Sequence, residues 1–135
     1  MALTKVTNEL LEIGVKEFGT GSILISNDGG TGTIDAANYN TGLGFEVFNA
    51  ITTGDQNIGV GSFAHEALTT GSNNVAIGLN NSRALTTGDQ NTSVGSLALR
   101  TTTTATGNTA LGYSSLNANT TGDRNVAIGW SAMSV

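Results

Sequence analysis

The sequence repeats with a period of 17 residues, and an Asn begins each unit. A Gly follows each Asn four places later, so repeat positions are numbered here with the Asn as position one. The two columns are Asn40, Asn57, Asn74, Asn91, Asn108 and Asn125, and Gly44, Gly61, Gly78, Gly95, Gly112 and Gly129. Five full units and a partial sixth cover residues 40–135. This regularity predicts a stack of similar structural units.

Each unit is too short for a pair of helices, and its β-branched residues, Gly and Asn disfavour helix. We therefore predict an all-β solenoid whose coils each hold two short strands and two turns. The second position is Thr, Ile or Val, the third is small and the fourth is apolar. This alternation predicts that the second and fourth side chains point into the coil. Ala and Leu at positions eleven and twelve predict the interior of a second strand. The Gly at position five is expected to end the first strand.

Three further columns predict how the coils stack. Thr pairs at positions thirteen and fourteen, and the Asn column, are expected to form ladders that bond one coil to the next. Asp55, Asp89 and Asp123 at position sixteen are interpreted as turn residues. In the fourth unit Ala105 replaces a turn Gly and Gly107 follows, which predicts a locally reshaped turn. At position ten, Glu66 and Arg83 on neighbouring coils predict a surface ion pair.

Composition excludes several kinds of site. The chain of 135 residues has no Cys and one His, so thiolate metal sites and multi-histidine centres are excluded. We expect no metal, no cofactor, no catalytic residues and no enzymatic activity. A net charge of -5 argues against nucleic acid as a partner. No apolar run approaches the roughly 20 residues of a membrane-spanning helix.

The words NVAIG, NTALG and NTSVG, followed by a short apolar run and TTG, resemble the repeats in the heads of trimeric autotransporter adhesins and in phage tail-fibre and tailspike proteins. The resemblance covers residues 40–135. It implies a left-handed parallel β-roll that assembles into a homotrimer, either intertwined or side by side. It also implies a structural virion protein, a trimeric phage fibre or tail-associated component that contacts the host surface. A capsid decoration protein is the alternative, and a bacterial trimeric adhesin head fragment is a further alternative.

The first 39 residues lie outside the repeat and are expected to form a separate small segment. Ser22–Ser26 and Thr31–Asp35 are candidate strands joined by a hairpin at residues 27–30. Residues 1–18 fit a helix or a strand equally well. By the resemblance, residues 1–39 attach the chain to other virion proteins.

Aromatic residues at position six are the candidates for receptor contact. Tyr113 and Trp130 are the two considered, because exposed rings stack on sugars, although aromatics more often pack between chains. The partner would be a host surface glycan or protein. The ten Asn and Gly residues of repeats two to six are structural: Asn57, Gly61, Asn74, Gly78, Asn91, Gly95, Asn108, Gly112, Asn125 and Gly129.

Overall fold

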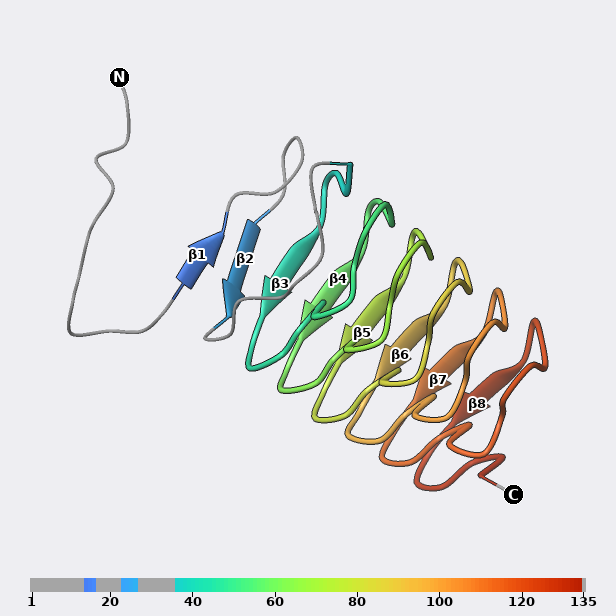
Figure 1. Cartoon of the computed structure of the whole chain (residues 1–135). Helices are drawn as coiled ribbons and strands as arrows, with labels where there is room; N and C mark the ends of the chain where they lie inside the picture. The colour runs from blue at the N-terminus through green and yellow to red at the C-terminus, as the bar shows by residue number, and fades with distance from the viewer. Residues whose placement is uncertain (1–13, 17–22, 27–35, 135) are drawn as a thin grey trace.

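One sheet of eight strands organises the described part of the chain (Figure 1). The computed structural model describes residues 14–16, 23–26 and 36–134. Its strands are β1 (Gly14–Lys16), β2 (Ile23–Ser26), β3 (Thr41–Leu43), β4 (Ile58–Val60), β5 (Val75–Ile77), β6 (Thr92–Val94), β7 (Thr109–Leu111) and β8 (Val126–Ile128). The strands lie in sequence order across the sheet, and no described residue is helical.

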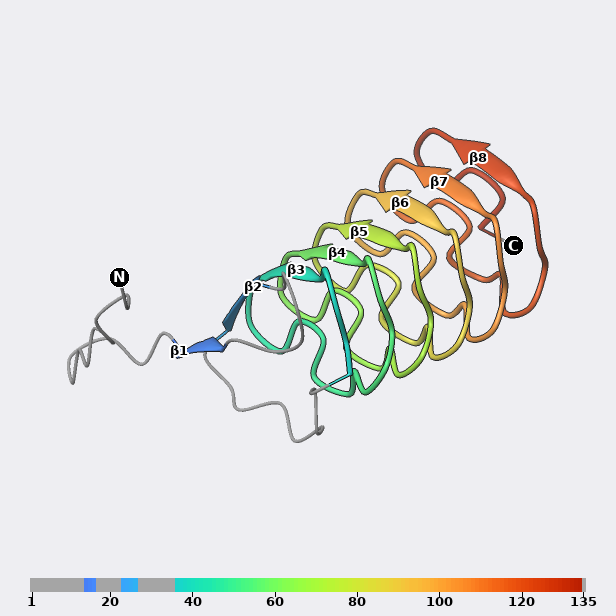
Figure 2. The same ribbon diagram turned by 90° about the horizontal axis from the view of Figure 1, so that it is seen from above.

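The repeat produces a parallel β-solenoid. From β3 to β8 each strand pairs in parallel with the next, and paired residues are always 17 apart, as Thr41 with Ile58. Figure 2 shows the coils stacked behind one another with one strand in each. The prediction of an all-β parallel solenoid with 17-residue coils is confirmed.

The N-terminal strands extend this sheet. β2 pairs in parallel with β3, and β1 pairs antiparallel with β2. Of the strand predicted at Ser22–Ser26, the described residues Ile23–Ser26 form β2, and β1 shows extended structure within residues 1–18. Thr31–Asp35 and the hairpin at residues 27–30 lie outside the described residues. The division of the chain at residue 39 stays a prediction.

Each coil has one strand, so the second predicted strand is wrong. Turns occupy the rest of the coil, with non-glycine residues at positive φ at positions seven and nine. In the second coil these are Phe63 (φ 60°) and His65 (φ 52°). Such conformations are uncommon for bulky residues. They are held here by hydrogen bonds between coils, such as the Phe63 amide donating to the Phe45 carbonyl at 2.8 Å.

The strands also face the opposite way from the prediction. The third position is buried, with Ala76 fully covered, whereas Ile77 at position four is 39% exposed. The reason is space inside the coil: a Cβ added to Gly59 would lie 2.6 Å from Val47 Cγ2 on the opposite wall. No side chain fits at Gly59, and the third position of the other coils is Gly, Ala or Ser. Positions two and four therefore point outward, and the prediction that they fill the interior is wrong.

The interior is filled from the opposite wall by positions eight, nine and twelve. Ile51, Leu68 and Leu85 at position twelve are buried as predicted, whereas the Ala residues at position eleven lie partly exposed. The buried hydrophobic residues form two clusters, one in the first coils and one in the last. Between them lies a polar layer of buried side chains, in which the hydroxyls of Ser82 and Ser93 lie 2.8 Å apart.

Close stacking explains the glycines. Gly78 has a φ of +137°, and a Cβ there would lie 2.7 Å from the carbonyl of Gly95. At position fifteen the glycines do not have positive φ; an added Cβ at Gly71 would instead collide with the next coil's carbonyl. The reshaped turn predicted in the fourth unit is wrong. Gly107 has a φ of 73°, close to the 59° of Gln90 at the same position, and Ala105 is buried.

Candidate functional site

The Asn column forms a buried ladder along the solenoid. Asn74 donates from Nδ2 to the Gly88 carbonyl at 2.9 Å and to Asn57 Oδ1 at 3.1 Å. Its own Oδ1 accepts from the Asn91 backbone amide at 2.9 Å. These bonds satisfy both ends of the Asn74 amide, so this side chain has no free group for a ligand. The predicted Asn ladder is therefore present, while the structural role assigned to the ten Asn and Gly residues stays a prediction.

Two further polar columns also serve stacking. The Thr69 hydroxyl donates to the Thr86 carbonyl at 3.0 Å, and the same bond recurs along position thirteen. At position sixteen the Asp55 carboxylate accepts from the Asn38 backbone amide at 2.6 Å, and the Asp89 carboxylate accepts from the Ser72 amide at 2.7 Å. The acids alternate with Ser or Thr, so like charges do not stack on adjacent coils. The Thr ladder is confirmed at position thirteen, whereas the hydroxyls at position fourteen donate no hydrogen bond to the next coil within residues 36–134.

Half of the exposed large hydrophobic residues in the described part of the chain lie on the outer face of the sheet. This apolar sheet face consists of positions two and four of β3 to β8, which point away from the coil interior. Its exposed members are Leu43, Ile58, Ile77, Val94, Val126 and Ile128. Side chains of this kind normally lie inside a protein, and contiguous exposed patches mark contact surfaces. The sequence predicted these residues as core, so it missed this surface.

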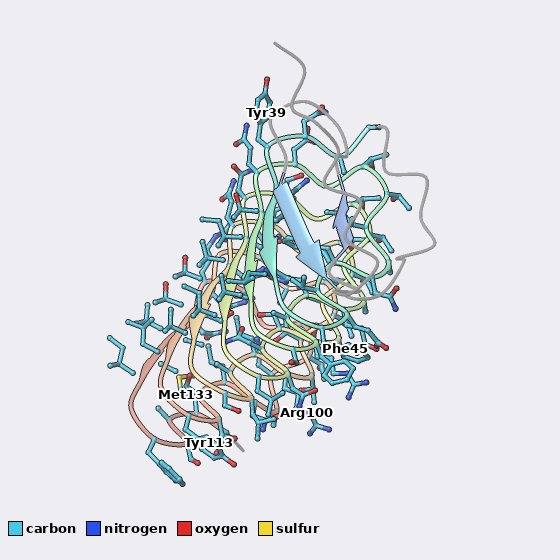
Figure 3. The ribbon with its side chains drawn as sticks, turned by 90° about the vertical axis from the view of Figure 1, so that its left-hand side faces the viewer. Tyr39, Phe45, Arg100, Tyr113 and Met133 are labelled. Carbon is cyan, nitrogen blue, oxygen red and sulfur yellow. The ribbon has the colours of Figure 1, made fainter. Side chains whose placement is uncertain are left out.

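The aromatic residues at position six lie beside the sheet face. Tyr113 and Trp130 stack on each other, with ring centroids 4.4 Å apart and an angle of 23° between the rings. They are 42% and 77% exposed. Figure 3 shows Tyr113 on the surface of the solenoid. The structure thus brings the two candidate receptor residues together, while contact with a receptor stays a prediction.

The predicted ion pair at position ten is present. The Arg83 guanidinium pairs with the Glu66 carboxylate and lies 4.9 Å from the centroid of the Phe63 ring.

The chain's one histidine lies in the coil interior. His65 is fully buried, neither ring nitrogen has a hydrogen-bond partner, and burial lowers the pKa of its imidazole to about 3. A buried uncharged imidazole with no nucleophile or acid bonded to it supplies no acid–base chemistry at neutral pH.

Within residues 14–16, 23–26 and 36–134, no three His, Asp or Glu side chains cluster closely enough to hold a metal ion. The same part of the chain contains no helix that could span a membrane.

No protein-family model, curated protein or solved structure matches the chain. The apolar sheet face, which runs along β3 to β8, is the surface feature on which a functional proposal can rest.

Proposed function

We propose that this chain is a structural, rod-forming protein whose left-handed β-roll assembles into a homotrimer through the apolar sheet face. The exposed apolar face is the observation that carries the proposal. Large side chains point outward from β3 to β8, while Ala, Gly and Ser fill the interior side of the same strands. A stack built in this way gains most from a partner that covers its outer face.

The energy available from this face is moderate. Its six exposed large side chains are 39–68% exposed. Withdrawing each from water would contribute about 1 kcal/mol, or about 6 kcal/mol per subunit as an upper estimate. The face is about 24 Å long and about 10 Å wide. Its area is therefore much smaller than the roughly 800 Å² that a stable interface buries on each partner. The columns beside the sheet, position six among them, must therefore join the interface.

Within this proposal the trimer is a fibre or tail-associated part of a phage-like particle, attached to other virion proteins through residues 1–39. The resemblance of the NxAIG-type words supports this placement. Distal coils then face the host surface. Cryo-electron microscopy of the intact particle distinguishes this location from its alternatives. Density for the chain on the capsid shell would favour a decoration protein, and its presence on a bacterial surface would favour an adhesin head.

Sedimentation equilibrium tests the assembly directly. The wild-type chain is expected to sediment with three times the monomer mass at micromolar concentration. Ile77→Asp places a charge in the centre of the face and is expected to yield a folded monomer. Thr87→Asp is the matched control, because Thr87 is exposed on a turn away from the strands; it should remain a trimer. A stable wild-type monomer would contradict the proposal.

A further inference from the structure

A groove of about 550 Å³ runs along the flank of the solenoid away from the strands. Figure 3 shows Arg100, one of its lining residues, on this side of the coils. Position ten supplies the charged and polar lining side chains, and position eleven supplies a floor of small residues. The lining residues are Asn49, Ala50, Glu66, Ala67, Arg83, Ala84, Arg100 and Thr101. The groove therefore crosses four successive coils, about 14 Å of the stack.

Two arginines line the groove in a chain that is otherwise acidic, and the charge of Glu46 acts on Arg83 in addition to that of Glu66. The groove contains two arginines and one glutamate, against a net charge of -5 for the whole chain. Arg83 is held in place by its bond to Glu66 and by the Phe63 ring beneath it. Arg100 is exposed on the next coil and forms no ion pair with any described residue. One fixed and one free guanidinium thus lie side by side, a pattern suited to an anionic group.

The backbone of the groove has no edge to offer a peptide. The Ala50 amide donates to the Glu66 carbonyl, the Ala67 amide to Arg83 and the Ala84 amide to Arg100, each at 3.1 Å. An extended peptide binds mainly by main-chain hydrogen bonds to a free strand edge. Because these donors are already paired between coils, a ligand must be recognised through the arginines and through apolar contact with the alanine floor.

We propose that this groove binds a short stretch of acidic saccharide. A carboxylate of the saccharide would accept hydrogen bonds from Arg83 and Arg100, and the apolar faces of its sugar rings would lie on Ala67 and Ala84. Four coils offer room for several linked rings. The inference rests on the proposed function in one respect, since it takes its ligand from the host surface, but the groove lies on the first four coils and not on the distal ones. It concerns a different surface from the one that assembles the trimer.

Backbone amide NMR titration with trigalacturonic acid tests the inference on the full chain. Shifts are expected at Ala67, Ala84 and Arg100. The methyl ester of the same trisaccharide keeps the rings but removes the charges, and it should bind at least tenfold more weakly. Arg100→Gln should weaken binding of the acid about tenfold, as for loss of a charged hydrogen bond. Arg124→Gln is the matched control, because Arg124 is exposed outside the groove and its loss changes net charge equally.

Ala84→Leu provides a test that leaves charge unchanged. Filling the floor should abolish the shifts, while the thermal melting curve stays that of the wild type. Equal binding of the methyl ester, equal binding of poly-glutamate, or no shifts at all would each overturn the inference. Sedimentation reports on the proposed trimer separately. If the chain is a trimer that does not bind the saccharide, only the groove inference is wrong. If it is a monomer that binds the saccharide, only the proposed assembly is wrong.

Discussion

Mild acid should destabilise this protein through His65. The imidazole stacks on the Phe48 ring, with centroids 5.7 Å apart, and is fully excluded from solvent. Neither nitrogen has a hydrogen-bond partner, so nothing in the interior compensates a positive charge. Burial lowers the pKa of His65 from its ordinary value of 6.5 to about 3.

The sign and size of the effect follow from proton linkage. Because the folded pKa is depressed, the unfolded chain binds the proton more readily between pH 6.5 and pH 3. Stability is therefore complete above pH 6.5 and falls as the pH drops towards 3. With these two pKa values, the free energy of unfolding should decrease by about 2 kcal/mol from pH 7 to pH 5.

Urea denaturation at fixed protein concentration, at pH 7, 6 and 5, measures this decrease. The control is His65→Leu, because Leu99 and Leu116 occupy the same repeat position in later coils. This variant should lose little or no stability over the same window. His65 is the chain's one histidine, so its C2 proton signal can be followed without ambiguity in the folded protein. A midpoint near 6.5 in that titration, or an unchanged pH dependence in His65→Leu, would refute the reasoning.

Three further predictions concern the stack itself. Gly78→Asn should lower the free energy of unfolding by at least about 3 kcal/mol, because its φ of +137° and the next coil's carbonyl exclude a side chain. Gly107→Asn, at a φ of 73° in more open space, should change it by less than about 1 kcal/mol, and equal losses would count against the close-approach argument. Asn74→Ala should lose about 3 kcal/mol in urea melts, since it leaves two buried backbone groups unpaired; a neutral result would mean that the ladder contributes little. Leu85→Ala should lose about 2–5 kcal/mol and the half-exposed Leu79→Ala less than about 1 kcal/mol, and calorimetry showing the reverse order would contradict the assigned interior.

The period was enough to predict the architecture. Residues that recur every 17 positions can all satisfy the same bonds only if the coils stack in register, and the strand pairs show this register. The roles of Asn and Thr followed for the same reason, because a side chain repeated in one column bonds to its own neighbours. Glu66 and Arg83 were likewise predictable as partners, since they occupy the same position on adjacent coils.

Which face of each strand points into the coil could not be predicted in the same way. Alternation shows that positions two and four share a face, but it does not say which face is inside. Hydrophobicity alone favours the larger residues as core, whereas the opposite wall leaves room for only a small side chain, such as that of Ala76. Residues at positions seven and nine have positive φ in types as different as Phe63 and Asn80, so no residue type marks those turns. For this reason the sequence led to the prediction of a second strand where the coil instead has turns.

The division of the interior suggests why the stack tolerates a thin core. Two hydrophobic clusters are separated by the polar layer around Ser82 and Ser93, so no single core spans all the coils. Continuity across that layer comes instead from the ladders and the strand pairs, which pass through every coil without interruption. A solenoid held in this way can keep small residues inside and direct its larger ones outward. The side that carries them is then available for assembly, and the opposite flank, with its arginine-lined groove, remains free for a ligand.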